Sequence, residues 1–481
     1  MPTINIPVAN GYYESDSLPI SAQRCINLYP NIPQAPALSD GTLFGTPGIT
    51  QLVTTSSLNH SNRGAHVKNG IPYFVNGSIL YSLDRTIDAE GIETFSTTAL
   101  GTIAGANPVS MSDNGTQLMI LVPGIGGYIY NEDAGTPFQA ITDPDFTASG
   151  TPQYCAFVDG YFLATTDSKK WIISALNDGL SWDALDFGTA ESDPDIIVAP
   201  IVFKNQVFIT GSEITEAFQN QPNGSGFPFI RSNLFLQKGC YAPRSLISAN
   251  NTFMMIGGGV NESPAVWQFT GGGFQKVSTT AIDNVLSNIS DIDLASAFAF
   301  SYSDKGAYFV GFTAAEYTFV YDVITGRWHE RKSTINNVQD RWRVNSMVTA
   351  YGRVLVGDSQ DGRIGELSDD VFTEYGERIE RSFSTQPLSN HGNSVRIPMI
   401  ELTVESGVGN GGEDDPMVSM DISDDAKTWK YERSRALGKI GKYTNRVIWY
   451  RNGRSPRFRV FRFKISDPVK CVIIKLEAKI A

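Results

Sequence analysis

The sequence has no uninterrupted apolar stretch of about 18 residues, the minimum for a helix that spans a bilayer. Its first 20 residues carry Glu14 and Asp16 but no lysine or arginine, so the basic start of a secretory signal is absent. Charged residues make up only 18% of the chain and hydrophobic residues 41%, a balance that excludes bulk disorder. We therefore expect a folded protein without a membrane span or a secretory signal.

Cysteine and histidine are also rare among the 481 residues. The four cysteines are far apart and form no CxxC pair, and the four histidines form no HExxH or HxH pattern. These residues are Cys25, Cys155, Cys240, Cys471, His60, His66, His329 and His391. The pattern argues against a disulfide framework, a zinc site or a catalytic histidine. We expect free thiols and a chain that folds in a reducing cytoplasm.

Motifs of common catalytic sites are missing. There is no GxSxG elbow and no P-loop, and the glycine runs at 124–127 and 257–259 do not open a helix. Glycosidases built on β-propellers need paired carboxylates, and sialidases also need clustered arginines. Residues 100–230 hold only three basic residues, Lys169, Lys170 and Lys204. The sequence therefore predicts a protein that is not an enzyme and has no cofactor.

A repeat of about 45 residues is the most informative feature that is present. A turn dipeptide followed by an apolar run recurs seven times, with steps of 45, 45, 45, 46, 54 and 47 residues. The dipeptides are Asn69-Gly70, Asn114-Gly115, Asp159-Gly160, Lys204-Asn205, Asn250-Asn251, Asp304-Lys305 and Tyr351-Gly352. Asn-Gly and Asp-Gly favour two-residue hairpin turns, and a short continuous apolar run is typical of a strand buried on both faces.

This period suits one four-stranded propeller blade, and circular closure would protect the strand edges. The sequence thus predicts an all-β fold whose residues 41–380 form a β-propeller of about seven blades. The alternative is a β-rich array that does not close, such as stacked sandwiches.

Outside this region the pattern changes. Apolar segments at 397–404, 417–422, 444–450, 457–465 and 470–476 predict strands of a small C-terminal β-sandwich-like domain over residues 381–481. Residues 406–416 between two of them predict a surface loop. Residues 1–40 contain five prolines before position 35, which predicts an extended N-terminal arm over the propeller or a neighbouring subunit.

Charge is distributed unevenly. Residues 427–481 hold 16 Lys/Arg and 3 Asp/Glu, a net charge of +13, which leaves −25 for residues 1–426 within the total of −12. Six arginines with two interleaved aromatic residues form the candidate interface. They are Arg446, Arg451, Arg454, Arg457, Arg459, Arg462, Trp449 and Tyr450. Such a cluster is compatible with a solvated charged face, an interface with an acidic partner, or direct DNA contact.

Several phrases resemble one known family. DGLSWDALDFGTAESDPDIIV, GSEITEAFQNQPNGSGFPF and LQKGCYAPRSL, at 178–198, 211–229 and 236–246, look like the centre of the packaged-DNA stabilisation proteins. Those are the tail hub, or nozzle, proteins of P22-like short-tailed phages. The ending VIWYRNGRSPRFRVFRFKISDPVK at 447–470 and the phrases NLYP and TPGI near the start are also similar to that family.

The resemblance implies a virion tail protein that assembles in the host cytoplasm and forms a homo-hexameric ring below the portal and its adaptor. That ring would continue the channel for double-stranded DNA without binding it specifically, retain packaged DNA until genome ejection, meet a needle or plug, and dock tailspikes or fibres. The arginine cluster would then lie in an interface between copies, because a head-to-tail ring needs two complementary patches on each copy. The alternative function is a carbohydrate-binding propeller for host-surface adsorption, with Trp171, Trp182, Trp267 and Trp328 as platform residues.

Overall fold

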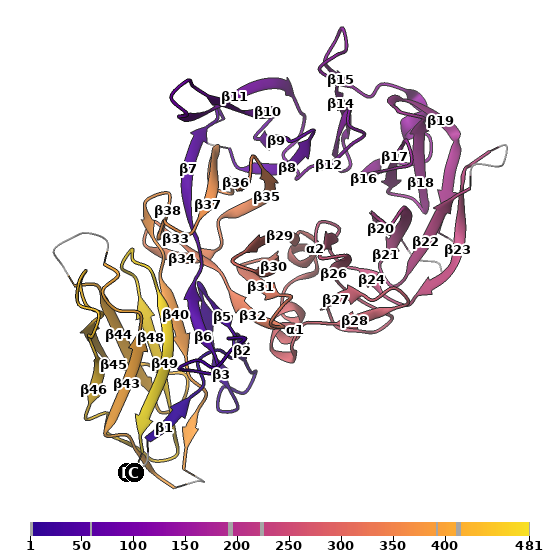
Figure 1. Ribbon diagram of the computed structural model, residues 1–481. Helices are drawn as coiled ribbons and strands as arrows, with labels where there is room; N and C mark the ends of the chain where they lie inside the picture. The colour runs from indigo at the N-terminus through magenta and orange to yellow at the C-terminus, as the bar shows by residue number, and fades with distance from the viewer. Residues whose placement is uncertain are drawn as a thin grey trace.

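The computed structural model describes residues 3–57, 60–190, 196–221, 226–390, 393–409 and 415–480. These residues form seven antiparallel blades around a common centre, with a β-sandwich beside the ring (Figure 1). The predicted all-β fold, with a seven-bladed propeller and a C-terminal β-sandwich, is confirmed. His391 and positions 410–414 of the predicted loop lie outside the described residues.

Each blade places its first strand at the centre and its last strand at the rim. The first blade contains β8 (Asn62–Lys68), β9 (Ile71–Asn76), β10 (Ile79–Ile87) and β11 (Glu93–Thr102), and the second contains β12 (Ser110–Asp113), β13 (Leu118–Val122), β14 (Gly126–Tyr130) and β15 (Phe138–Ala140). The third blade contains β16 (Pro152–Val158), β17 (Tyr161–Thr166), β18 (Lys170–Ala175) and β19 (Asp178–Thr189). The fourth contains β20 (Ile197–Phe203), β21 (Gln206–Gly211), β22 (Thr215–Asn220) and β23 (Phe229–Leu236). A short 3-10 helix, η1 (Pro144–Thr147), precedes the third blade.

The fifth blade contains β24 (Gly239–Cys240), β25 (Ile247–Ala249), β26 (Thr252–Gly258), β27 (Ala265–Phe269) and β28 (Phe274–Lys276). The sixth blade contains β29 (Phe298–Asp304), β30 (Ala307–Ala314), β31 (Tyr317–Asp322) and β32 (Arg327–Glu330). The seventh contains β35 (Val344–Ala350), β36 (Arg353–Asp358), β37 (Arg363–Ser368) and β7 (Gly48–Thr54). Helices α1 (Thr280–Ser287) and α2 (Asp291–Ala295) lie between the fifth and sixth blades. They account for the 54-residue step, and Ile282, Leu286 and Leu294 pack into the core there.

The repeated turns join the first and second strands of the blades, as the sequence predicts. Asn69, Asp159, Asn250 and Tyr351 all have a positive φ, between 47° and 56°, which suits the first position of a tight hairpin. In the sixth blade the turn lies one residue later than predicted, because Asp304 pairs with Ala307. The second strands that follow are buried on both faces; all five residues of β13 and all seven of β26 are buried.

The ring is closed by the N-terminal part of the chain. Strand β7 pairs antiparallel with β37, with Gly48 opposite Ser368 and Arg363 opposite Thr54. The outermost strand of the seventh blade therefore comes from a position before the first blade. Beyond β7, the hairpin of β38 (Thr373–Glu374) and β39 (Glu377–Arg378) extends this sheet.

The sandwich consists of two sheets that enclose one apolar core. One sheet contains β46 (Val447–Tyr450), β43 (Met399–Val404), β49 (Val472–Lys479), β6 (Thr42–Gly45) and β5 (Leu28–Asn31), with β1 (Thr3–Ile6) also on β49. The other contains β40 (Arg381–Ser384), β48 (Phe458–Ile465), β44 (Met417–Ser423) and β45 (Lys430–Ala436), with β41 (Leu388–Ser389) on β48. Three further sheets have two strands each: the pairs β2 (Tyr13–Glu14) with β3 (Ala22–Gln23) and β33 (Lys332–Ile335) with β34 (Val338–Arg341) are consecutive in the chain, whereas β42 (Val395–Arg396) pairs with the distant β47 (Arg454–Ser455).

The N-terminal segment forms paired strands instead of the predicted extended arm. Strands β1, β5 and β6 belong to the sandwich, while β4 (Cys25–Ile26) pairs antiparallel with β40 and parallel with β32 of the sixth blade. Its prolines do not prevent this arrangement; Pro30, for example, lies in β5, an edge strand that leaves one side unpaired. One sheet therefore runs from the sixth blade through β4 into the sandwich.

Asn27 fixes the junction of the two parts. It has a φ of 54°, a left-handed conformation that asparagine tolerates better than most residues. Its buried side chain donates to the carbonyl oxygens of Lys332 and Glu380, at 2.9 and 2.8 Å, and accepts from the Lys332 amide. The segment that follows the sixth blade and the start of the sandwich are thus held by one side chain.

Ile49 tests the closure of the ring. It lies in β7, is 1% exposed, and packs in the core between the sixth and seventh blades. We expect Ile49→Ala to lower the free energy of unfolding by about 2–5 kcal/mol, because it leaves a cavity in a buried core. Leu185→Ala is the control, since Leu185 is 79% exposed and should change stability by less than about 0.5 kcal/mol. Urea unfolding followed by tryptophan fluorescence measures both; equal effects would contradict this role of Ile49.

Candidate functional site

The arginine-rich surface is built on one edge of the sandwich, where the two sheets end in β45 and β46. Two side chains of β45 cross this edge and satisfy carbonyl groups of β46. Arg433 donates to the Tyr450 carbonyl at 3.0 Å, and Arg435 donates to the Ile448 carbonyl, also at 3.0 Å. The Trp449 indole donates in the opposite direction, to the Arg433 carbonyl at 2.9 Å. The open edge is therefore sealed by side chains that sit above the core.

Two of the eight predicted interface residues lie inside the protein, which corrects that part of the prediction. Trp449 is fully buried against Phe463, with ring centroids 5.5 Å apart. Arg459 is 4% exposed, donates to Asp424 at 2.8 Å, and also bonds the carbonyl oxygens of Asn452 and Arg454. Arg459 shares the inward face of β48 with the core phenylalanines, so the basic–apolar alternation of this strand does not place every arginine in solvent.

An open groove of about 360 Å³ lies beside this edge. We call it the basic groove; its lining includes Lys430, Tyr431, Arg433, Arg451, Arg454 and Arg459, together with one carboxylate, Asp424. Asp424 already bonds Arg459. Arg451 and Arg454 are exposed and have no carboxylate partner among the described residues. The groove therefore presents uncompensated positive charge.

Aromatic side chains flank this charge. Tyr431 is 69% exposed and Tyr450 is 57% exposed. Burial lowers the pKa of Arg433, and the neighbouring charges of Arg435 and Arg459 lower it further. Arg433 and Arg459 line the same groove, so their positive charges lie close together and an incoming anionic group would be stabilised there.

The remaining predicted arginines point to other surfaces. Arg446 is exposed and makes a two-pronged ion pair with Glu401, with distances of 2.7 and 2.6 Å. This hydrogen bonding lowers the pKa of Glu401. Arg457 is exposed, at the turn before β48. Arg462 lies on the opposite face of β48 from Arg459.

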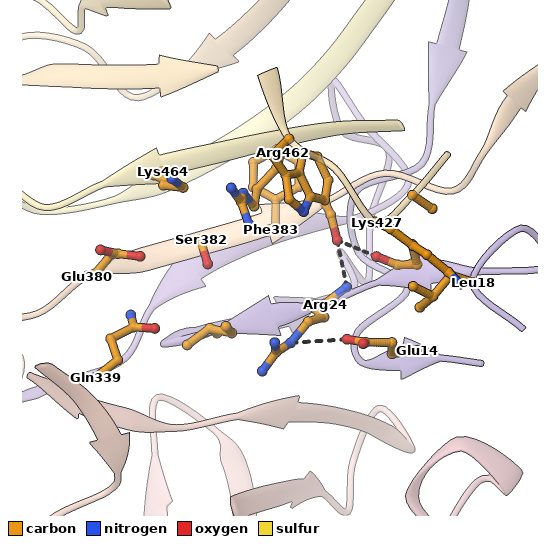
Figure 2. A pocket seen from close by; sticks show the side chains of 15 residues that line it. Glu14, Leu18, Arg24, Gln339, Glu380, Ser382, Phe383, Lys427, Arg462 and Lys464 are labelled. Carbon is orange, nitrogen blue, oxygen red and sulfur yellow. Dashed lines mark hydrogen bonds and ion pairs between the residues drawn. The ribbon is translucent and has the colours of Figure 1, made fainter. Parts of the chain in front are cut away.

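Arg462 belongs to a cleft at the junction of propeller and sandwich, which we call the junction cleft (Figure 2). It bonds Asp421 at 2.7 Å and stacks over Trp429, with the guanidinium carbon 4.1 Å from the ring centroid. Arg24 lies in the same cleft and pairs with Glu14 at 3.2 Å. Arg24 also binds the buried carboxylate of Glu330 in the sixth blade, at 2.6 Å. Most charges of the junction cleft are thus paired within the chain and fasten its two parts together.

The structure therefore divides the predicted cluster. Arg451 and Arg454 meet in the basic groove, Arg446 and Arg457 lie on other exposed surfaces, and Arg462 lies in the junction cleft. Lys430, Tyr431 and Arg433 of β45 complete the groove and were missed by the sequence analysis. The alternation of Tyr431, Arg433 and Arg435 along one strand is the signal that could have indicated them.

Within the described ranges, no three His, Cys, Asp or Glu side chains are close enough to hold a metal ion. His66 bonds Asp113 at 2.7 Å, and burial lowers the pKa of His329 to about 3, so His329 is neutral. No helix in the part of the chain that the structure describes is long and apolar enough to cross a membrane.

The fold and the groove define a class: a propeller–sandwich protein with a positively charged groove on its sandwich. Residues 4–372 match the family model described as bacteriophage P22 Gp10, β-propeller, and residues 380–481 match the model described as bacteriophage P22 Gp10, β-sandwich. The chain belongs to this family, which confirms the resemblance found in the sequence. It is a structural protein of the phage tail and therefore a component of the virion.

Other comparisons add little. None of the curated proteins matches this chain. Among solved structures, the WD40 β-propeller domain of Doa1 is 11% identical over 67% of this chain and 97% of its own, with a TM-score of 0.40. The N-terminal domain of Nup159 is 10% identical over 70% and 98%, with a TM-score of 0.38. TM-scores below 0.5 are too low to support a shared role, so membership in the phage family depends on the family models.

Arg459 and Arg457 provide a matched pair for testing which arginines are structural. Arg459→Met leaves Asp424 and two carbonyl groups without their donor, so we expect a loss of about 2–4 kcal/mol in the free energy of unfolding. Arg457→Met removes an exposed charge and should cost less than about 0.5 kcal/mol. Chemical denaturation followed by tryptophan fluorescence compares them, and an Arg459→Met protein as stable as the wild type would refute the structural role.

Proposed function

We propose that this protein is the tail hub, or nozzle, of a short-tailed phage and that it forms a homo-hexameric ring below the portal and its adaptor. The observation that carries the proposal is the separation of charge within one chain. Residues 427–481 have a net charge of +13 and expose the basic groove, whereas the remainder has a net charge of −25. Membership in a family of phage tail proteins supports a role in virion assembly.

In this proposal the basic groove binds the acidic body of the neighbouring copy. A head-to-tail ring requires two different, complementary patches on each copy, and a groove and a body of opposite charge meet that requirement. The exposed Tyr431 provides apolar contact area in the groove with Arg451 and Arg454, and the exposed Tyr450 directly precedes Arg451 in the chain. Tyrosine and arginine are the residue types that contribute most often to the energy of protein interfaces.

The same distribution of charge suits the passage of DNA. Phosphates are attracted to clustered lysines and arginines and repelled by carboxylates. If the acidic body faces the lumen, double-stranded DNA can slide through the ring without specific binding. The hub would then retain the packaged genome through a needle or plug at its end and offer its outer surface to tailspikes or fibres.

The alternative, a carbohydrate-binding propeller, has less support from the described residues. Stacking platforms for sugars require exposed aromatic rings. Trp171, Trp182 and Trp328 are buried at 0%, 5% and 2% exposure, and the ring of Trp267 is covered by the Lys238 ammonium group at 4.4 Å. Binding of host glycans by the isolated protein would support the carbohydrate-binding function instead.

The ring can be tested by negative-stain electron microscopy of the concentrated protein, alone and with its portal–adaptor complex. We expect six-fold rings from the wild type, in at least one of the two conditions. The double variant Arg451→Glu, Arg454→Glu should reduce the fraction of rings at least tenfold, because two attractive contacts become repulsive. Rings of the wild type should also be fewer at high salt, which screens unlike charges.

The matched control is Arg327→Glu, Arg378→Glu, which makes the same change in net charge at two exposed arginines outside the groove. This control should assemble like the wild type. If the groove variant forms as many rings as the wild type, the basic groove is not the contact between neighbouring copies. If the wild type forms no rings even with the portal–adaptor complex, the proposal that this protein is a tail hub is wrong.

A further inference from the structure

The centre of the propeller is a cavity of about 250 Å³ to which all seven blades contribute. Apolar inner-strand residues such as Ala65, Met111, Ala199 and Met347 line it together with polar residues, and more of its wall is polar than apolar. Arg244 is the one charged residue among the described residues that line it, and no carboxylate is present in this lining. A single positive charge thus lies on the axis of a protein whose net charge is −12.

The fifth blade places Arg244 at the central cavity through a loop in its inner strand. Its inner strand is interrupted: β24 and β25 both pair with β26, and residues 241–246 form a loop between them. Pro243, Arg244 and Leu246 of this loop reach the central cavity. In the other six blades, as far as they are described, the inner strand is continuous.

The loop is held in one conformation. The fully buried Ser245 hydroxyl donates to the Ala242 carbonyl at 2.7 Å and accepts from the Ile256 amide at 2.9 Å. The Tyr241 amide donates to the Ile256 carbonyl at 2.9 Å, and the Ala299 amide donates to the Arg244 carbonyl at 2.9 Å. The position of Arg244 is therefore fixed by the neighbouring sixth blade as well as by its own.

The Arg244 guanidinium has no hydrogen bond or ion pair with any described residue. Its one close partner is the Phe298 ring, whose centroid lies 4.9 Å from the guanidinium carbon. A second guanidinium, that of Arg341, lies 5.9 Å from the same centroid, so positive charge is concentrated around this ring. Burial, and to a smaller extent the charge of Arg341, lower the pKa of Arg244 to about 10, which still leaves it protonated at pH 7.

Unpaired hydroxyl groups face the same space. The Ser346 Oγ atom, on the inner strand of the seventh blade, is buried and has no hydrogen-bond partner. Tyr154, on the third blade, is another residue that lines the cavity, and no hydrogen bond of its hydroxyl is found among the described residues; the charge of Arg244 acts to lower the tyrosine pKa against the larger effect of burial. Buried polar groups are normally satisfied, so unpaired donors around one cavity indicate a ligand that accepts hydrogen bonds.

We propose that the central cavity binds one small oxyanion of the phosphate class, held by Arg244 and by the Tyr154 and Ser346 hydroxyls. These donors come from three different blades, and a tetrahedral oxyanion offers acceptor oxygens in several directions. The cavity is large enough for such an ion. The bound anion would neutralise the central charge and link non-adjacent blades. The proposal is independent of ring formation.

Isothermal titration of the full-length protein with inorganic phosphate at pH 7 tests this site, with sodium chloride at equal ionic strength as the blank. We expect one saturable site per chain. Arg244→Gln should weaken binding at least tenfold, since a charged hydrogen bond is lost. Tyr154→Phe and Ser346→Ala should each weaken it about threefold to tenfold. Arg327→Gln, which changes an exposed arginine that does not line the central cavity, is the control and should bind like the wild type.

Melting temperatures separate binding from a purely structural role. Phosphate should raise the melting temperature of the wild type and of Arg327→Gln but not that of Arg244→Gln. Without phosphate, Arg244→Gln should melt no lower than the wild type, because it removes an unpaired charge. Failure of the wild type to bind phosphate would overturn the proposal, as would an Arg244→Gln protein that binds equally well. If Arg244→Gln does not fold, the combined Tyr154→Phe, Ser346→Ala variant decides by the same measurements.

Discussion

The pairing of β7 with β37 is the interaction on which the rest of the structure depends. It joins residues 48–54 to residues 363–368 and gives the seventh blade its outermost strand. Without it, the seventh blade would expose an unpaired edge at the gap in the ring. The central cavity would also lose its geometry, because every blade is positioned by its two neighbours. Closing so long a loop has an entropic cost that grows only slowly with its length, so the burial of Ile49 and its neighbours can offset it.

Arginine serves several purposes in the second half of the chain. Arg343 and Asp358 form a buried pair, 2.6 Å apart, within the seventh blade, and Arg459 ties a loop of the sandwich to Asp424. Arg433 seals a sheet edge by bonding a carbonyl group of the opposite sheet. The planar guanidinium, with its five donors, suits each of these tasks. Arg451 and Arg454 make none of these contacts, so their guanidinium groups can bind a partner molecule.

Much of the fold could be predicted because its signals are local. A hairpin turn and the apolar strand after it lie within about ten residues, so Asn69-Gly70 and its six counterparts revealed the blades. Pairings between distant segments left no such signal. Strand β1 joins β49, and β4 joins both β32 and β40, through backbone groups that any residue possesses. The predicted boundaries at residues 40 and 380 remain predictions for this reason, since strands from either side share sheets. The site was predicted in part: residue type indicated the arginines, but burial of Arg459 depends on which face of β48 it occupies.

The position of the closing strands in the chain has a consequence for synthesis on the ribosome. Strand β7 emerges early, but its partner β37 follows only after some 300 further residues. At about 5–20 residues per second, β7 waits roughly 15–60 seconds for it. Strand β1 waits longer still, because its partner β49 begins only at Val472. The sandwich can therefore be completed only after all seven blades have been synthesised, and a nascent chain that stops before β49 leaves β1 without its partner.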